Sequence, residues 1–144
     1  MKIKLKKINK RAIIPKYMTP LSAGMDIYAC IEEEIILKPG QRVLIPTGIA
    51  LSIPEGYEAQ IRPRSGLALK YGVFPINTPG TIDADYRGEI KIILANLGEK
   101  EFKIKYGDRI AQMIINKIEK CEFVIVDELD KSQRGDGGFG STGY

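Results

Sequence analysis

Short apolar runs separated by proline and glycine turns recur along most of this chain, and they limit the possible folds more than any other feature. Examples are Ile35–Leu37, Val43–Ile45 and Ile49–Ile53, which Pro39-Gly40 and Pro46 separate from one another. Brief strands that alternate with turns about every 8–12 residues are typical of all-β sandwiches and barrels. The sequence therefore predicts an all-β fold, either a sandwich or a barrel.

Alternation of polar and apolar residues predicts further strands, and one segment has the composition of a helix. Beyond the runs above, strands are predicted for residues 2–8, 22–29, 57–61, 91–97, 101–105, 109–115 and 123–126. Residues 65–71 are good helix formers with Ser65 as a possible cap, and Gly72 is placed to end a helix. Residues 11–20 contain two prolines and are interpreted as a loop. We therefore expect one short helix in an otherwise β-stranded chain.

Length and composition indicate one domain followed by an arm. A chain of 144 residues can bury about two-thirds of its unfolded surface without metal or disulfide crosslinks. Residues 133–143 are glycine-rich, and Phe139 is their one large apolar side chain. Such a segment buries too little apolar surface to order itself. We predict a β-barrel domain over residues 1–130 and a flexible C-terminal arm over residues 131–144.

Charge and residue types exclude several kinds of chemistry. The net charge of +4 indicates, weakly, anionic ligands and gives no sign of a nucleic-acid track. Because the chain has no histidine, catalysis must rest on carboxylate, Arg, Lys, Ser or Tyr side chains. Cys30 and Cys121 form no zinc-binding pattern and are interpreted as reduced, buried side chains. The chain shows neither an apolar run of about 18 residues nor the apolar core of a signal peptide, so we expect a soluble cytoplasmic protein with no membrane partner.

Residues 77–90 contain the densest group of side chains capable of chemistry. Turn residues at positions 77, 79 and 80 are followed by Asp83 and Asp85, with Tyr86 and Arg87 directly behind them. Loops held by rigid strands often carry catalytic and binding groups. A plain polar turn is the alternative, and the spacing of the two aspartates leaves a metal-binding or acid–base pair open.

Three other segments offer groups that suit an anionic ligand. Arg64, Ser65 and Gly66 stand at the start of the predicted helix, where backbone N–H groups, the helix dipole and a guanidinium suit phosphate. Asp108 and Arg109 either pair at a turn or contribute to a site. The arm offers charge, an aromatic ring and hydroxyl groups, which suit a flap over a phosphorylated ligand with a planar ring. The alternatives are a capped helix, a paired turn and a mobile tail.

Asp26 is a single carboxylate inside a predicted strand. Alternation places it on the face opposite Met25 and Ile27, where an aspartate usually faces solvent. Taken alone, this position predicts no chemistry.

These segments, in their order and spacing, resemble the five motifs of the trimeric dUTP pyrophosphatases (dUTPases). The corresponding segments are residues 23–28 (AGMDIY), 63–68 (PRSGLA), 77–88, 107–112 (GDRIAQ) and 134–143 (RGDGGFGSTG). Phe139 occupies an aromatic position where some relatives have histidine, which leaves stacking intact. The match spans nearly the whole chain, and five ordered motifs are far more specific than any single one.

The resemblance implies a jelly-roll-like β-barrel subunit that forms a homotrimer with active sites shared between subunits. The implied reaction is hydrolysis of dUTP to dUMP and pyrophosphate by attack of water on the α-phosphate, assisted by Mg²⁺. This reaction limits uracil incorporation into DNA and supplies dUMP for thymidylate synthesis. The implied Mg²⁺ is held mainly by substrate phosphates and water, so no protein side chain is expected as a direct ligand.

The resemblance also implies roles for individual residues. Asp83 is the implied general base that activates the attacking water, and the Tyr86 ring leaves no room for a ribose 2′-hydroxyl. Asp26 and Asp108 are implied to hold arginines and water in place, and Asp85 is interpreted as structural. The implied substrate-binding residues are Arg64, Ser65, Gly66, Asn77, Thr81, Ile82, Asp83, Tyr86, Lys91, Gln112, Arg134, Phe139 and Gly140.

Two other functions fit the same fold class. A dCTP deaminase, alone or combined with dUTP hydrolysis, needs a glutamate that activates water beside the pyrimidine C4. Here the loop instead has Asp83 and Tyr86 in the dUTPase arrangement. A non-catalytic jelly-roll module that binds nucleotide is expected to lack the base or the arm, and this chain has both. The sequence therefore predicts dUTP hydrolysis.

Overall fold

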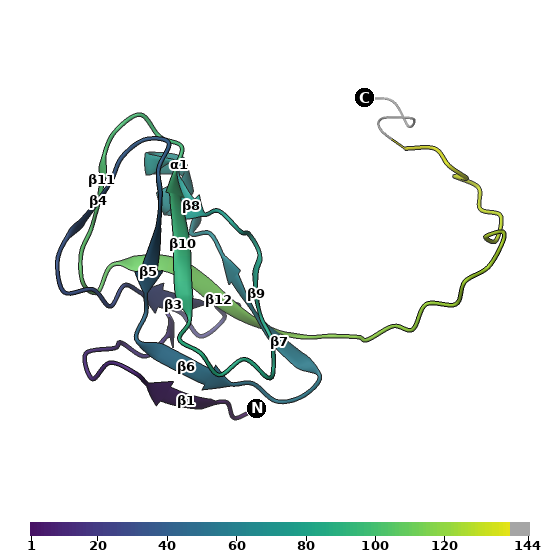
Figure 1. The fold of residues 1–144 in the computed structure, drawn as a ribbon, viewed down its shortest axis with the longest axis horizontal. Coiled ribbons are helices and arrows are strands. Elements are labelled where there is room, and N and C mark those ends of the chain that lie inside the picture. The colour runs from purple at the N-terminus through teal and green to yellow at the C-terminus, as the bar shows by residue number, and fades with distance from the viewer. Residues whose placement is uncertain (139–144) are drawn as a thin grey trace.

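The computed structural model describes residues 1–138, which form short β-strands and one helix (Figure 1). The strands are β1 (Lys4–Lys7), β2 (Lys16–Tyr17), β3 (Met25–Tyr28), β4 (Ile35–Leu37), β5 (Arg42–Pro46), β6 (Ile49–Ser52), β7 (Tyr57–Arg62), β8 (Val73–Pro75), β9 (Gly80–Ile82), β10 (Lys91–Asn96), β11 (Phe102–Ile104) and β12 (Arg109–Lys117), and the helix is α1 (Ser65–Tyr71). The largest sheet has the strand order β2-β3-β12-β7-β9, and a three-stranded sheet has the order β5-β10-β8. The pairs β1-β6 and β11-β4 complete the all-β, jelly-roll-like barrel that the sequence predicts.

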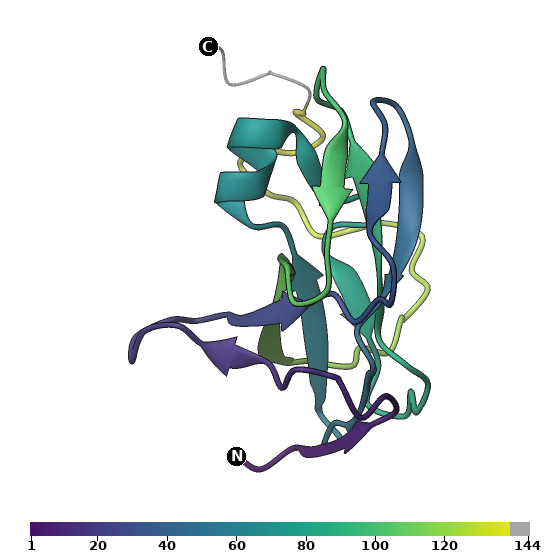
Figure 2. The same ribbon diagram turned by 90° about the vertical axis from the view of Figure 1, so that its left-hand side faces the viewer.

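Apolar side chains from the two larger sheets meet in one core. Ile27 on β3 and Ile92 and Leu94 on β10 are at most 1% exposed and belong to the same cluster. Ile93, between the last two, is partly exposed, as the period of two in a strand requires. Strand β12 pairs with both β3 and β7 and so holds the centre of the five-stranded sheet. Figure 2 shows the β2–β3 hairpin and α1 projecting from the same side of the barrel.

The predicted helix is confirmed with the same bounds. Gly72 ends it with φ +66°, and its N–H donates to Ala68 O, as in a left-handed helix termination. The prediction of a Ser65 cap was wrong, because Arg64 is the N-cap residue and no side chain caps the helix. Arg64 has extended backbone, so it connects the last residues of β7 to the helix.

Most predicted strands are present, but three short ones are not predicted by the sequence. Strand β2 has two residues and lies inside the segment interpreted as a loop. Strand β8 contains Pro75 and lies at the edge of its sheet, where a residue without an N–H group is tolerated. Strand β9 begins at Gly80, a residue that favours turns in a sequence pattern. All three pair with longer strands that hold them in place.

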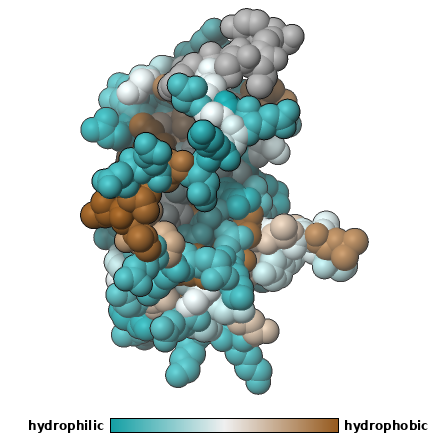
Figure 3. Space-filling model, turned by 90° about the vertical axis from the view of Figure 1, so that its right-hand side faces the viewer, coloured by the Kyte–Doolittle hydropathy of each residue, from teal (hydrophilic) through white to brown (hydrophobic). Residues whose placement is uncertain are grey.

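The predicted strand over residues 123–126 was wrong. The last strand ends at Lys117, and residues 118–138 leave the barrel without forming a helix or strand (Figure 1). Phe123 and Ile125 are 89% and 97% exposed. A β-branched composition favours a strand only where a neighbouring strand is available to pair with it. Figure 3 shows the face from which this segment leaves, with exposed apolar side chains among hydrophilic ones. The division at residue 130 stays a prediction.

Two other expectations concern cysteines and membranes. Cys30 is buried, but Cys121 lies in the segment after β12 and is exposed, so the prediction that both are buried was wrong for Cys121. Both are free thiols. Within the described part of the chain, no helix has the length and apolar character needed to cross a membrane.

Candidate active site

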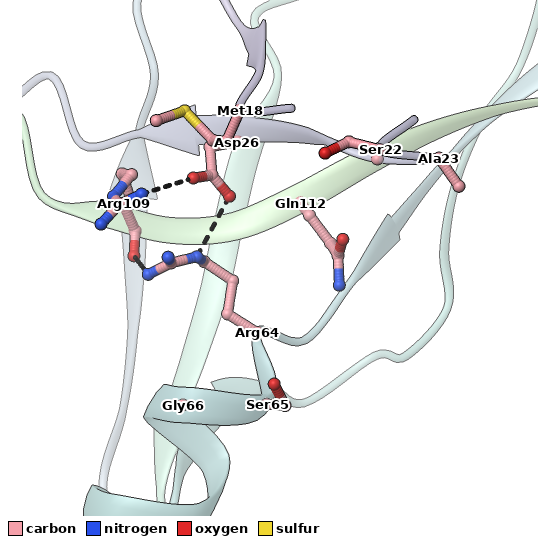
Figure 4. A pocket seen from close by; sticks show the side chains of 10 residues that line it. Met18, Ser22, Ala23, Asp26, Arg64, Ser65, Gly66, Arg109 and Gln112 are labelled. Atoms are coloured by element: carbon pink, nitrogen blue, oxygen red, sulfur yellow. Dashed lines mark hydrogen bonds and ion pairs between the residues drawn. The ribbon is translucent and has the colours of Figure 1, made fainter. Parts of the chain in front are cut away.

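A pocket of about 380 Å³ opens between β3, β12 and the start of α1 (Figure 4). The tip of the β2–β3 hairpin forms one wall, and the N-terminal end of the helix forms another. Its lining residues are Met18, Ser22, Ala23, Gly24, Asp26, Arg64, Ser65, Gly66, Arg109 and Gln112.

Asp26 lines this pocket and is only 8% exposed. Its Oδ1 accepts a hydrogen bond from Arg64 Nε at 3.1 Å, and its Oδ2 accepts one from Arg109 Nη1 at 3.1 Å. Arg64 Nη1 also donates to the backbone oxygen of Arg109 at 3.0 Å. One carboxylate therefore holds two guanidinium groups, and the excess positive charge suits an anionic ligand.

Strand pairing explains why these groups meet. Asp26 on β3 lies opposite Gln112 on β12, so both residues are near the middle of the five-stranded sheet. The register between the two strands shifts between Arg109 and Ala111. Irregularities of this kind re-aim side chains at the ends of strands. Asp26 is on the face that alternation predicts, but the side chains of Arg64 and Arg109 cover it, so it is buried and not solvated.

Gln112 fixes the backbone that leads into the helix. Its Nε2 donates to Pro63 O at 2.9 Å. The same side chain crosses Gly24 so closely that a Cβ there would lie 3.3 Å from Gln112 Cδ and nearer to Oε1. A side chain at position 24 would therefore displace the Gln112 amide from its place beside Pro63. Ser65 and Gly66 are exposed at the first two helical positions, where N–H groups have no partner within the helix.

Residues 77–90 lie at a different part of the barrel, and none of them lines this pocket. Strand β9 is antiparallel to β7, with Ile82 opposite Ala59. Asp83 therefore follows β9 near the start of β7, whereas Arg64 follows the end of β7. At about 3.3 Å per strand residue, the two positions are separated by roughly 15–20 Å along the strand.

Tyr86 folds back onto its own loop. Its hydroxyl donates to Glu89 O at 3.0 Å, and its backbone N–H donates to Asp83 O at 3.2 Å. Arg87 Nη1 donates to the backbone oxygen of Ala84, so it also holds the loop from within. Asp83 is exposed to solvent, which leaves its carboxylate accessible to a ligand.

Comparison with known proteins identifies the family. A family model described as dUTPase matches residues 10–143. The chain belongs to the dUTPase family. The deoxyuridine 5′-triphosphate nucleotidohydrolase of Finegoldia magna is 59% identical over 143 residues, which cover 99% of this chain and 100% of that protein. The enzyme of the same name from Syntrophotalea carbinolica is 55% identical over 142 residues, covering 99% and 97%.

Solved structures of dUTPases have the same fold. A mutant dUTPase of Staphylococcus bacteriophage 80alpha with dUpNHpp matches with a TM-score of 0.87 and 29% identity, covering 99% of both chains. A mutant dUTPase from phage phi11 of S. aureus, solved for the coordination of a structural Mg(II) ion, matches with a TM-score of 0.80 and 25% identity, covering 91% of this chain and 100% of that one.

The first, second and fourth dUTPase motifs meet at the pocket, and one chain supplies all three. Their predicted site residues at this pocket are Asp26, Arg64, Ser65, Gly66 and Gln112. Sequence reasoning left open whether Arg109 pairs with Asp108 or contributes to a site, and it missed Met18 and Ser22 as lining residues. The signal for Arg109 is its place in the fourth motif beside an acidic residue, whereas no sequence signal indicates Met18 or Ser22.

The predicted residues of the third dUTPase motif lie on the separate loop and strand β9, and Lys91 follows the motif at the start of β10. Asn77, Thr81, Asp83, Tyr86 and Lys91 are exposed, and Ile82 is partly buried. The structure therefore does not bring the predicted base and the phosphate pocket together within one chain.

The structure places Asp108 differently from the prediction. Its Oδ2 accepts from Lys105 N at 2.8 Å and stabilises the turn before β12. Within residues 1–138 no arginine pairs with it, since Arg109 binds Asp26 instead. Arg134 is exposed, and its Nε donates to Gly137 O at 2.7 Å. The predicted residues Phe139 and Gly140 lie outside the described residues.

The donor set in the dUTPase pocket does not resemble a metal cage. Within residues 1–138, no three Cys, Asp or Glu side chains gather as possible ligands, and the chain has no histidine. The carboxylate in the pocket is engaged by two arginines. These groups fit a Mg²⁺ ion that arrives on substrate phosphates and keeps several waters.

Proposed function

We propose that this chain hydrolyses dUTP to dUMP and pyrophosphate by attack of water on the α-phosphate, with Mg²⁺. The observation that carries the proposal is the pair of guanidinium groups fixed by Asp26 beside the start of α1. Family membership supplies the substrate class. The reaction removes a source of uracil in DNA and provides dUMP for thymidylate synthesis.

The pocket suits the triphosphate of the substrate. Arg64 uses its Nε and one Nη1 hydrogen within the protein, which leaves Nη2 and the second Nη1 hydrogen for phosphate oxygens. The Ser65 hydroxyl, the Gly66 N–H and the Gln112 amide add neutral donors around the same space. Donors that are fixed before the reaction stabilise the charge that develops on the leaving pyrophosphate.

Asp83 is the proposed general base. Its exposed carboxylate accepts a proton from the attacking water while the water oxygen bonds to the α-phosphorus and the bond to pyrophosphate breaks. A carboxylate takes this role because the chain has no histidine. A positioned base contributes about 10²–10⁴-fold to such a reaction.

The loop around Asp83 also suits recognition of the nucleoside. In the proposed complex the Tyr86 ring packs against the deoxyribose and leaves no space for a 2′-hydroxyl. Asn77 and the chain around Thr81, Ile82 and Lys91 bind the edge of uracil. A site that hydrogen-bonds one base edge rejects another strongly, because mismatched polar groups stay buried and unpaired.

We also propose a homotrimer with shared active sites. A general base must come within about 2.6–3.2 Å of the group whose proton it takes, whereas Asp83 and Arg64 lie at opposite ends of β7 in one chain. A loop from one subunit set against the pocket of another satisfies both observations. The exposed apolar segment 123–126 supports association, since soluble monomers rarely leave such patches uncovered.

The arm is proposed to close the shared site. Residues 131–144 of a further subunit bring Arg134 toward the terminal phosphate, Phe139 onto the uracil ring, and Gly140 beside the ligand. Mg²⁺ bound to the triphosphate offsets phosphate charge, and no protein side chain is proposed as its ligand. A cytoplasmic location and the lack of a nucleic-acid or membrane partner stay predictions.

A pyrophosphate-release assay with dUTP, dCTP, dTTP and UTP tests the proposed function. We expect Mg²⁺-dependent release from dUTP, with far lower kcat/KM for the other three nucleotides. Equal release from all four would contradict the proposed recognition of base and sugar. Release of ammonia from dCTP would instead support a deaminase.

A further inference from the structure

The ring of Tyr86 lies directly against the backbone of Gly88. A Cβ built on Gly88 would lie 2.6 Å from Tyr86 Cζ and 2.9 Å from Cε2, with the hydroxyl oxygen closer still. These separations are shorter than any that packed carbon atoms adopt. Gly88 is not among the glycines with positive φ, so a side chain here would meet no backbone strain of that kind but would force the Tyr86 ring to shift.

The hydroxyl of Tyr86 fixes the other end of the ring. It donates to Glu89 O at 3.0 Å. Tyr86 is nevertheless exposed, with 45% of the residue accessible to solvent. One side of the ring therefore rests on the chain between residues 86 and 89, and the remaining surface is free to meet a ligand.

Glu89 is bound to a part of the barrel that lies far from this loop in the sequence. Its Oε1 accepts from Gly48 N at 2.8 Å, and its Oε2 pairs with Lys91 Nζ at 3.6 Å. The next residue, Ile90, donates its N–H to Ile49 O at 2.9 Å. The turn between β5 and β6 thus holds the carbonyl group that binds the tyrosine hydroxyl.

We propose that Gly88, with Glu89, positions the Tyr86 ring and thereby sets the preference for deoxyribose over ribose. This inference rests on the proposed function, in which Tyr86 faces the sugar. A ring that excludes one hydroxyl group must stay within a few tenths of an ångström of its place, because interiors and sites tolerate only small changes in volume. A side chain at position 88 displaces the ring from its bond to Glu89 O, so the ring no longer holds the place from which it excludes a 2′-hydroxyl.

The alanine variant of Gly88 tests the proposal through the ratio of kcat/KM for dUTP to kcat/KM for UTP. We expect G88A to lower this ratio on the order of tenfold, since discrimination by one small group is worth about 10–200-fold. The Y86A variant gives the value of this ratio when the tyrosine ring is absent. Misalignment of Asp83 would lower both rates together and leave the ratio unchanged.

The double variant Y86A/G88A separates a contact with the ring from any other effect. With the ring removed, the added methyl group has nothing to displace, so we expect the same ratio as in Y86A. The control is G56A, because a Cβ at Gly56 meets no atom within 4 Å but its φ of +79° makes alanine strained. We expect G56A to lose stability and to keep the parental ratio.

Several outcomes would overturn the proposal. A parental ratio in G88A would do so, as would an equal effect of the methyl group with and without the Tyr86 ring. A crystal structure of G88A with the hydroxyl still bonded to Glu89 O would also overturn it. If the parent protein itself showed no preference for dUTP over UTP, the proposed function would fail, and this inference with it.

Discussion

The pocket around Asp26 and the loop over residues 77–90 both contain predicted site residues, but the chain fixes them in different ways. Hydrogen bonds of Asp26 reach Arg64 and Arg109, which are 38 and 83 positions away in the sequence. In the loop, the side chains of Tyr86 and Arg87 bond to backbone oxygens no more than three residues away. Asp26 is buried, whereas Asp83 is exposed.

We call the pocket around Asp26 the preformed half of the site. The loop over residues 77–90 is the presented half, because its groups are offered to a ligand from the surface. Three elements hold the pocket, so its charges are in place before a phosphate arrives, which lowers the cost of organising them. The loop is anchored at its base by Glu89, and its Asp83 carboxylate is exposed to solvent. An exposed group of this kind acts only on a ligand that other residues hold in place. This agrees with the proposal that two subunits complete one site.

The largest expected effect is on turnover, and it comes from a substitution in the presented half. Asp83→Asn removes the proposed base and keeps the size of the side chain, so we expect kcat for dUTP to fall by about 10²–10⁴-fold. The affinity for dUTP and the free energy of unfolding should change little, since Asp83 is exposed. Single-turnover kinetics measure turnover, calorimetric titration measures the affinity, and urea unfolding measures the free energy of unfolding. Asp85→Asn is the matched control and should stay within a few-fold of the parent.

Mixing inactive variants tests whether the two halves belong to different subunits. Asp83→Asn and Arg64→Gln each disable one half, so co-expressed trimers that assort at random should contain intact sites at about a quarter of positions. Activity should then return to that fraction of the parental rate. If the mixture stays inactive although mixed trimers form, both halves act within one chain, and the proposal of shared sites is wrong.

An intermediate effect is expected from the preformed half. Asp26→Asn removes the charge between Arg64 and Arg109, and loss of one partner of a buried ion pair is costly. Because the two arginine side chains are 26% and 43% exposed, we expect a loss of about 1–3 kcal/mol in the free energy of unfolding, at the low end for such pairs.

The same variant should raise KM for dUTP about tenfold, because the guanidinium groups lose their fixed positions. Urea unfolding and steady-state kinetics measure both effects. An unchanged KM would show that the pocket does not bind the triphosphate. The expected contrast is that Asp26→Asn weakens binding and stability, whereas Asp83→Asn reduces turnover alone.

The sequence predicts the local elements of this fold better than it predicts the site. The helix over residues 65–71 and most strands follow from composition and alternation, which are local properties. The burial of Asp26 does not, because alternation gives the face of a strand and not the side chains that cover it. For the same reason the sequence leaves open whether Arg109 pairs with Asp108 or contributes to the site. The separation of Asp83 from Arg64 depends on the pairing of β9 with β7, which local patterns do not specify.

The smallest expected effect is on the pH dependence of stability. It concerns Cys30, which packs beside Gly48 where the loop is anchored to the barrel. A Cβ on Gly48 would lie 3.0 Å from Cys30 Sγ, and Gly48 N binds Glu89. Burial raises the pKa of the Cys30 thiol, and the nearby Glu89 acts in the same direction, while Arg11 and Lys7 lower it. The neutral thiol is therefore favoured in the folded state.

The neutral Cys30 thiol contributes its full stabilisation of the folded state below the pKa of an unfolded cysteine, about 8.5. This stabilisation is lost as pH rises through the pKa of the thiol in the folded state, which is higher. Between these two pKa values the free energy of unfolding falls by at most about 1.4 kcal/mol per pH unit. We expect urea unfolding at a fixed protein concentration to show a steeper alkaline loss in the parent than in Cys30→Ala. Cys121→Ala, at an exposed thiol, should keep the parental slope. Equal slopes for the parent and Cys30→Ala would show that the anchor of the loop tolerates a thiolate beneath it.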